Sequence, residues 1–482
     1  MSTYLVWSCR ILLLVAFLVG IFLSTYKLTV SPPTWKDEGI IVQVAQNISR
    51  HGVYGVQVAP QEFVPAGFVT TGYTVILPVA LFLKVFGEGL LQARSIMAIY
   101  LFCFFLLVYL LIKRGERCGP CIWAVWLLVS FAPLYGSGKS VLGEIPGTVF
   151  FLAFILCLRM IEVKYRGWWP MYLGAGIMAG LSMVTKPLFL IVVPVAVVLD
   201  YVDIKSRLPL KNILVSIFWT VVTVIAWVFV QFPGDSLYDI LAIYSGNLSD
   251  VPLPNLIAEN IYNTLTSLQP LYFLGLIVIW AVSLLWRKMN KEHVYVAESV
   301  AFYFSLVSLL AYLKTVGYFR YFLPGQIVAL VYLPNSLFYL AEQAPSKLRV
   351  RFSFILLAKA ILVILIIFQF YKTFFDSWVS DYYQITQTTD LGTVINSISA
   401  DKKVLFCNVP EAVTFFGGRN YYQYVEFADI IKRGDAPSAT VSRVGPDMIV
   451  VADRCPLVNN SVAGGYKVSA EAGKYRVLDK IK

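Results

Sequence analysis

Two neighbouring carboxylates, Asp37 and Glu38, follow the first apolar stretch of the chain and come directly before a short amphipathic segment. Apolar residues recur there every four positions from Ile40 to Ile48, which predicts a helix, and Gly52 is a suitable C-cap. Because a helix dipole favours carboxylates at its start, one interpretation is a helix-capping pair. The alternative is that the pair belongs to a functional site.

Basic residues recur in three further segments that also carry polar partners. Gly136 to Glu144 supplies Lys139 and Glu144, Thr185-Lys186-Pro187 supplies Lys186, and Lys314 to Tyr321 supplies Arg320 beside Tyr321. The topology derived below places all three on the outer side of a membrane, where basic residues are uncommon. Snorkelling to lipid phosphates is one explanation. The other is that the cations converge on one anionic ligand.

The elements that would hold these residues are membrane helices. Of 482 residues, 58% are hydrophobic and 14% are charged, and long apolar runs such as 213–230 and 355–370 approach the length of a bilayer span. The net charge of +11 does not indicate a nucleic-acid partner, since residues 375–482 carry 12 basic and 12 acidic side chains. The surplus lies in the apolar part, largely in five clusters of three typical of the positive-inside pattern.

These clusters predict eleven spans, because successive cytoplasmic clusters must be separated by an even number of crossings. The segment 73–86 is short and contains Pro78 and Lys84, so we expect it to lie at or dip into the outer interface. The predicted fold class is an all-α polytopic membrane protein with a small C-terminal α/β domain. The predicted domains are 1–374, with a first outer loop at 31–91, and 375–482 on the same outer side.

The ordered motifs resemble those of the GT-C membrane glycosyltransferases that use polyprenyl-phosphate sugars, typified by protein O-mannosyltransferases and lipid A aminoarabinose transferases. The resemblance covers most of residues 1–375. It rests on short motifs, which are Asp37-Glu38, Thr70-Thr71-Gly72-Tyr73, Arg94, Leu142-Gly143-Glu144-Ile145-Pro146, Thr185-Lys186-Pro187 and Phe319-Arg320-Tyr321-Phe322-Leu323-Pro324. It implies transfer of a sugar from a lipid-phosphate donor to a hydroxyl, with inversion, on the outer face of a bacterial inner membrane.

The resemblance also implies roles for individual residues. Asp37 would be the catalytic base, and Lys186, Arg320 and Lys139 would neutralise the phosphate. Glu38, Glu144 and Tyr321 are further candidate substrate contacts. No metal site and no cofactor are expected, although a divalent cation held by Asp37 or Glu38 with Glu144 stays open. The acceptor is a glycan, a lipid or a protein.

Past residue 375 the composition becomes that of a soluble domain. Short strands are predicted at 403–407 and 447–453, with a hairpin at 466–478. Cys407 and Cys455 each follow a strand end, so a disulfide is expected in an oxidising compartment. Tyr421, Tyr422 and Tyr424 are interpreted as core aromatics rather than an acceptor surface. The long segment 232–267 is interpreted as an acceptor-facing lid.

Two other functions compete with sugar transfer. A lipid or sugar transporter or flippase would also have many spans, but carriers usually place ionisable residues near the bilayer midplane and have repeated halves. Here the ionisable residues cluster at the outer ends. A non-catalytic assembly subunit would tolerate the loss of the Asp37 carboxylate.

Overall fold

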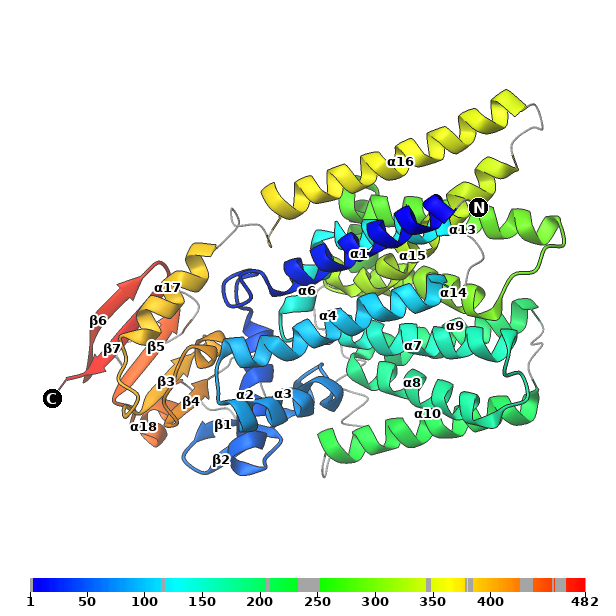
Figure 1. Ribbon diagram of the computed structural model, residues 1–482. Helices are drawn as coiled ribbons and strands as arrows, with labels where there is room; N and C mark the ends of the chain where they lie inside the picture. Colours follow the sequence, from blue (N-terminus) through cyan, green and yellow to red (C-terminus); the bar gives the residue numbers. More distant parts are fainter. Residues whose placement is uncertain are drawn as a thin grey trace.

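The computed structural model describes residues 3–113, 118–204, 209–232, 252–343, 348–377, 379, 385–424, 437–452, 455 and 465–481. Long helices form a bundle, and a small sheet lies at one end of it (Figure 1). Apolar side chains cover the outside of the bundle as well as its interior, for example Leu14 on the first helix and Phe229 on a later one. This is the surface that a protein exposes to lipid rather than to water.

Every segment predicted to cross the membrane is helical. The helices are α1 (Thr3–Thr25), α4 (Leu90–Lys113), α5 (Cys118–Val129), α7 (Glu144–Val163), α8 (Trp169–Thr185), α9 (Pro187–Ile204), α10 (Leu210–Gln231), α13 (Leu268–Met289), α14 (Val296–Tyr312), α15 (Leu323–Glu342) and α16 (Leu348–Phe375). In the described part of the chain, six helices are long and apolar enough to span a bilayer. The protein is therefore an integral, multi-pass membrane protein. Eleven crossings stay a prediction, because α8 has only 17 residues and α9 carries Asp200 and Asp203 near its end.

The segment between the third and fourth predicted spans differs from expectation. The sequence analysis treated Gly136 to Glu144 as a connection, but residues up to Lys139 lie in a separate helix, α6 (Ala132–Lys139). The chain bends by 58° between α5 and α6. Phe131 has an extended backbone at this bend, and Pro133 follows within the first turn of α6, where proline is well tolerated.

The first outer loop is compact. It contains α2 (Lys36–His51), strands β1 (Gly55–Ala59) and β2 (Glu62–Pro65), a short 3-10 helix, η1 (Ala66–Phe68), and α3 (Tyr73–Phe86). Helix α2 ends at Gly52 in the left-handed conformation, with φ of 69°, as its sequence predicts. Asn47 donates a 2.7 Å hydrogen bond to the carbonyl of Gly55 and so fixes β1 against α2. Helix α3 packs on α2, α4 and α8, and its interfacial position stays a prediction.

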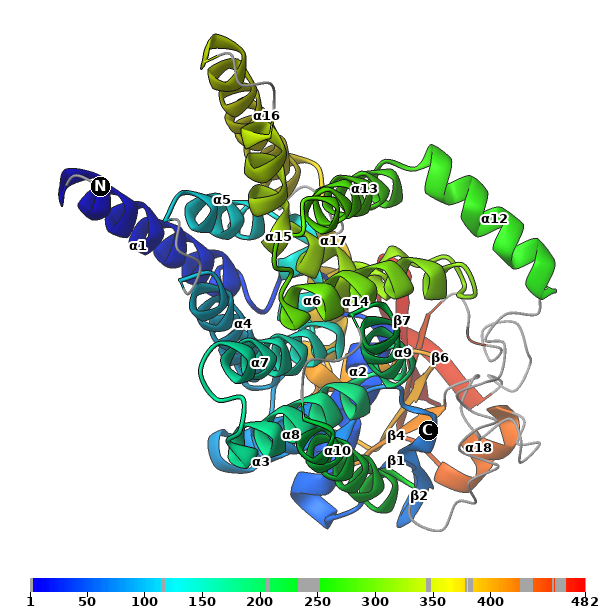
Figure 2. The same ribbon diagram turned by 90° about the vertical axis from the view of Figure 1, so that its right-hand side faces the viewer.

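Two further elements lie between later predicted spans. Helix α12 (Leu253–Thr266) precedes α13, and Figure 2 shows it projecting beyond α13 at the edge of the bundle. Residues 233–251 of the predicted lid lie outside the described residues. A short 3-10 helix, η2 (Phe319–Tyr321), joins α14 to α15.

The C-terminal part is the predicted α/β unit. It contains α17 (Ile385–Asn396), β3 (Val404–Cys407), the 3-10 helix η3 (Pro410–Thr414), β4 (Tyr421–Tyr424), α18 (Pro437–Val444), β5 (Met448–Ala452), β6 (Tyr466–Ala472) and β7 (Tyr475–Lys480). The strand order is β4-β3-β5-β7-β6, with β3 parallel to both of its neighbours and β7 antiparallel to β5 and β6. Cys407 and Cys455 form the expected disulfide. The three tyrosines of β4 are buried, so their interpretation as core residues is confirmed.

One hydrophobic core joins this sheet to the first outer loop. Buried residues of α2, β1 and α3 and those of β3, β5 and β7 belong to a single cluster, in which Val44 and Leu405 are both fully buried. Figure 1 shows α2 between the sheet and the bundle. The loop at 31–91 was predicted to belong to the membrane part, but it also shares a hydrophobic core with the C-terminal sheet.

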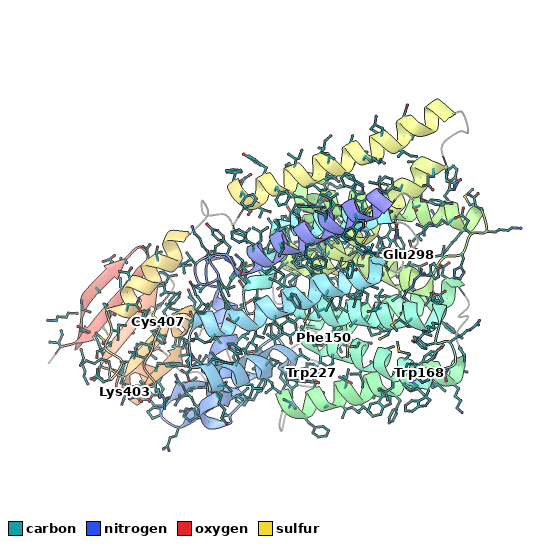
Figure 3. The ribbon with its side chains drawn as sticks, in the orientation of Figure 1. Phe150, Trp168, Trp227, Glu298, Lys403 and Cys407 are labelled. Atoms are coloured by element: carbon teal, nitrogen blue, oxygen red, sulfur yellow. A yellow bond between two sulfur atoms is a disulfide. The ribbon has the colours of Figure 1, made fainter. Side chains whose placement is uncertain are left out.

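The bundle has two chemically different ends. Figure 3 shows Lys403 and Cys407 in the sheet at one end, with Trp168 and Glu298 at the opposite end. Trp168 follows the basic cluster that contains Arg166, and Glu298 pairs with Arg287 of another cluster at 2.8 Å. These two basic clusters therefore lie at the end far from the sheet, as the charge pattern predicts. Arg114, Arg117, Lys205, Arg207 and Lys347 of the remaining clusters lie outside the described residues.

Candidate active site

Asp37 and Arg320 meet although 283 residues separate them in the sequence. Asp37 lies in the first turn of α2, and Arg320 lies in η2. An Nη2 hydrogen of Arg320 is donated to Oδ2 of Asp37 at 2.8 Å. The Asp37 side chain is 41% exposed and that of Arg320 is 16% exposed, so Asp37 is accessible from outside the protein while Arg320 is mostly buried.

Three aromatic rings surround the guanidinium of Arg320. Its central carbon lies 5.5 Å from the ring centroid of Trp35, 5.6 Å from that of Tyr318 and 5.5 Å from that of Tyr321. Such cation–π contacts orient a guanidinium without using its hydrogen-bond donors. Nε and Nη1 of Arg320 are buried and make no hydrogen bond to the described protein. Of these three aromatic residues, only Tyr321 was predicted from the sequence to belong to the site.

Lys186 and Glu144 form a second, more deeply buried pair. Their Nζ and Oε1 atoms are 3.3 Å apart, and the side chains are 6% and 2% exposed. Both Glu144 oxygens nevertheless lack a hydrogen bond of good geometry within the described residues. Since Lys186 is buried against protein, the snorkelling interpretation is wrong for it.

Glycines of two motifs let the chain reach Lys186 closely. A Cβ added to Gly72 would lie 1.8 Å from the carbonyl oxygen of Val184, and one added to Gly143 would lie 2.7 Å from that of Thr185. Gly72 also donates its N–H to Thr185 at 3.1 Å, and the hydroxyls of Thr74 and Thr185 are 2.7 Å apart. The motifs that begin with Thr70, Leu142 and Thr185 thus come together in one place and fix Lys186 beside Glu144.

The electrostatics tie the two pairs together. Burial would raise the pKa of Asp37, but the positive charges of Arg320 and then Lys186 outweigh it and hold that pKa below its ordinary value. Burial would lower the pKa of Arg320, but Glu144 and then Asp37 raise it. Asp37, Arg320, Lys186 and Glu144 therefore act on one another as a single cluster of two carboxylates and two cations.

Glu38 has a different environment from its neighbour Asp37. Its Oε1 and Oε2 accept hydrogen bonds from Nε and Nη2 of Arg94 at 2.8 and 2.7 Å, and both side chains are fully buried. Oε1 also accepts the N–H of Val141 at 3.0 Å. Nη1 of Arg94 donates to the carbonyls of Leu28 and Pro32. The interpretation as a helix-capping residue is therefore wrong for Glu38, which instead joins α2 to α4 and to the segment after α6.

Lys139 is also occupied by the protein. Its Nζ donates to the carbonyl of Tyr26 at 2.6 Å and to that of Ser31 at 3.3 Å, and the residue is 4% exposed. These contacts hold the segment between α1 and α2. The structure brings Asp37, Glu144, Lys186, Arg320 and Tyr321 together and places Glu38 and Lys139 behind them.

Asn260 of α12 is a polar residue that the sequence analysis did not identify. Its amide lies 2.7 Å from the carbonyl oxygen of Thr315, 3.2 Å from that of Leu313 and 3.4 Å from that of Tyr312. Asn260 is 1% exposed. It therefore holds the end of α14 five residues before Arg320. The contact could not be predicted from the sequence, because no helix was predicted within 232–267 and a single Asn there has no distinctive neighbours.

The carboxylates of the site are matched with protein cations rather than arranged around an empty centre. Asp37 pairs with Arg320, Glu38 with Arg94 and Glu144 with Lys186. No three His, Cys, Asp or Glu side chains of the described residues gather as a metal site. Carboxylates already paired with Arg and Lys are a poor donor set for the divalent cation that the sequence left open.

The fold matches solved structures over almost the whole chain. ArnT from Cupriavidus metallidurans bound to undecaprenyl phosphate has a TM-score of 0.64 at 12% identity, and the match covers 99% of this chain and 98% of that one. The Archaeoglobus fulgidus oligosaccharyltransferase in complex with Zn and sulfate has a TM-score of 0.61 at 12% identity, over 92% of this chain and 68% of that one. No protein-family model and no curated protein matches the sequence. The chain therefore has the GT-C fold that its motifs resemble.

Proposed function

We propose that this protein is a membrane glycosyltransferase that transfers a sugar from a polyprenyl-phosphate donor to an acceptor hydroxyl. The observation that carries the proposal is the contact of Asp37 with Arg320, next to buried Lys186 and Glu144. A base, two cations and a further carboxylate then meet at the outer end of the bundle. ArnT, which shares the fold, has been solved with undecaprenyl phosphate, and the archaeal enzyme AglB with dolichol phosphate, so lipid phosphates bind proteins of this fold.

Asp37 would act as the general base. It accepts the proton of the acceptor hydroxyl as that oxygen attacks the anomeric carbon. The bond between the anomeric carbon and the phosphate oxygen breaks, and the lipid phosphate leaves with the electron pair. A single displacement from the opposite face inverts the configuration. Because the leaving group is already a stable anion, no general acid is required.

Arg320 and Lys186 would hold the phosphate. The Nε and Nη1 donors of Arg320 are buried and make no hydrogen bond to the described residues, and since they lie on different edges of the guanidinium, each can donate separately to a phosphate oxygen. Lys186 adds a second positive charge beside Glu144. The charge that develops on the leaving phosphate is stabilised by cations already in place, which costs no reorganisation during the reaction.

Donor binding would also make Asp37 a better base. In the unliganded protein, Arg320 holds the pKa of Asp37 low, and a low pKa weakens proton abstraction. A phosphate on Nε or Nη1 brings negative charge close to Asp37 and offsets the guanidinium. The pKa of Asp37 then rises toward the range in which a carboxylate removes a proton more effectively. The base would thus be activated by the donor.

Glu144 would bind hydroxyl groups of the sugar or the acceptor, since its two oxygens are buried and, besides the ion pair of Oε1 with Lys186, accept no hydrogen bond from the described residues. Glu38 and Lys139 would position α2 and the end of α1 rather than contact substrate. The acceptor class is a glycan, a lipid or a protein, and the site would face the periplasm of a bacterial inner membrane.

The test separates binding from chemistry. Full-length protein in nanodiscs is measured for undecaprenyl phosphate binding by native mass spectrometry and for sugar transfer from polyprenyl-phosphate sugars. We expect Asp37→Asn to retain binding and lose transfer, and Arg320→Gln and Lys186→Gln to bind the lipid phosphate more weakly. Glu62→Gln, a half-buried carboxylate of β2 in the same loop, is the matched control and should change neither.

Undiminished transfer by Asp37→Asn would rule out the role of this residue. Movement of a labelled lipid across the bilayer by a wild-type protein that transfers no sugar would instead support a flippase.

A further inference from the structure

The C-terminal sheet domain touches the helix that carries Asp37 at its first turn. Helix α2 packs against η3, the 3-10 helix that follows β3. A Cβ added to Gly39 would lie 2.3 Å from the backbone nitrogen of Glu411, 2.3 Å from the carbonyl carbon of Pro410 and 2.4 Å from its oxygen. Because these are backbone atoms, no rotamer change would relieve the clash, and α2 and η3 would have to separate.

The contact continues along the whole helix. Tyr421 of β4 donates its hydroxyl hydrogen to Oε1 of Gln46, and the guanidinium of Arg50 lies 5.3 Å from the ring centroid of Tyr421. Gln46 and Tyr421 are each 1% exposed. The side of α2 that does not meet the bundle is thus held by the C-terminal domain from its first turn to its last.

A buried carboxylate lies at the contact. Glu411 is 7% exposed, and its Oε2 accepts no hydrogen bond from the described residues. Burial raises the pKa of Glu411, and the charges of Lys474 and of Lys36, which immediately precedes Asp37, oppose that rise. Lys36 also lowers the pKa of Asp37. The domain therefore meets the site through both backbone packing and charge.

We infer that the C-terminal domain is a positioning element of the active site, in which Pro410 and Glu411 press against Gly39 and set the distance between Asp37 and Arg320. Arg320 reaches Asp37 from a different part of the chain, η2, which joins α14 to α15. The catalytic carboxylate of Asp37 is then positioned by two segments, one containing Arg320 and one containing Pro410, which are 90 residues apart in the sequence. This inference rests on the proposed function only for its catalytic meaning, since the positioning itself does not depend on a substrate.

The test reads the surroundings of Asp37 directly. Full-length protein in nanodiscs is treated with a water-soluble carbodiimide and glycine ethyl ester over a range of pH. Mass spectrometry then follows the modification of Asp37, because the carbodiimide activates the protonated carboxyl. The charged groups that face Asp37 are Arg320, Lys186 and Lys36. The pH at half-maximal modification reports how closely these cations surround it.

We expect Gly39→Ala to move this midpoint to higher pH, because α2 has to shift when it separates from η3 and the 2.8 Å contact of Asp37 with Arg320 is then weakened. Arg320→Gln is the reference for complete loss of the pair and should move the midpoint further. Gly275→Ala is the matched control, since nothing lies within 4 Å of a Cβ at that position of α13. It should leave the midpoint unchanged.

An unchanged midpoint in Gly39→Ala, together with a raised midpoint in Arg320→Gln, would overturn the inference. If Gly39→Ala yields no folded protein, Tyr421→Phe gives the same reading from the other end of α2. It removes only the hydroxyl that binds Gln46 and should raise the midpoint by a smaller amount; an unchanged value there would also overturn the inference. A protein that transfers no sugar in any assay would refute the proposed function and leave these midpoints as they are.

Discussion

Asp37 and Glu38 show how adjacent residues of the same chemistry take different roles. Successive residues of an α-helix point in directions about 100° apart, so α2 directs Asp37 toward η2 and Glu38 into the protein. Glu38 meets Arg94 with both oxygens and is fully buried, whereas Asp37 keeps 41% of its side-chain surface. Only the exposed carboxylate can meet an acceptor hydroxyl. The sequence presents the two as equivalent, because burial depends on the partner helices.

Breaking the pair of Glu38 and Arg94 is expected to destabilise the protein strongly. Arg94→Met leaves a buried carboxylate without its cation, which typically costs about 3–5 kcal/mol. Arg476→Ala removes one partner of an exposed pair with Glu471 and should cost less than about 1 kcal/mol. Thermal unfolding of the purified proteins compares them. Equal melting temperatures for the two variants would contradict a structural role for Arg94.

Arg320 is expected to control the pH dependence of transfer. A base must be ionised to act, and the pKa of Asp37 is held below its ordinary value chiefly by Arg320. The acidic limb of kcat/KM should therefore lie at a lower pH than for an ordinary aspartate. Arg320→Gln removes the cation, so the limb should move to higher pH, while Arg320→Lys keeps a charge and should move it less. Superimposable limbs for wild type and Arg320→Gln would show that another group titrates.

Among the secondary-structure elements, the long apolar stretches were correctly predicted as helices, whereas the short elements in polar or glycine-rich segments were missed. Each predicted span is a helix, since some 20 apolar residues in a membrane have no other way to satisfy their backbone. Helix α6 was missed because the glycines and polar residues of 136–139 are typical of a loop. The hairpin of β1 and β2 was missed because Pro60 and Pro65 lie at the ends of its strands, where proline is typical of a loop. The motifs at Gly72, Gly143 and Thr185 were found, but only the fold shows that they touch.

Helix α12 is expected to hold the Arg320 segment in place through Asn260. Asn260→Ala removes the donor to the carbonyls at the end of α14, and a buried unsatisfied group costs about 1–3 kcal/mol. We therefore expect undecaprenyl phosphate to bind more weakly, by up to about tenfold, with the protein still folded. Asn255→Ala, an exposed position on the same helix, is the matched control. Equal binding by the two variants would separate α12 from the phosphate site.

For the whole molecule, the sequence predicted that the loop at 31–91 and the C-terminal domain lie on the same side of the membrane, but not that they share one hydrophobic core. Strand patterns and the cysteine positions predicted the sheet and the disulfide of Cys407 with Cys455. The shared core could not be predicted, because Val44 and Leu405 each look like ordinary core residues of their own segment. Contacts between distant parts of a chain leave no periodic signal when one sequence is considered alone. The proposed active site depends on this shared core, since α2, which carries Asp37, is part of it.

The orientation of the molecule gives a last prediction. Two single-cysteine variants report on the two ends of the molecule. Lys467→Cys lies on the exposed edge strand β6 of the sheet domain. Gly167→Cys lies before α8, in the connection at the opposite end of the bundle. If the sheet and Asp37 face outward, a membrane-impermeant maleimide should label position 467 in intact inner-membrane spheroplasts and position 167 only after lysis. The unsubstituted protein supplies the background, because its described free cysteines are buried or half-buried. The reverse pattern would place the sheet in the cytoplasm, where a disulfide is rarely maintained and where the basic clusters near Arg166 and Arg287 would oppose the positive-inside rule.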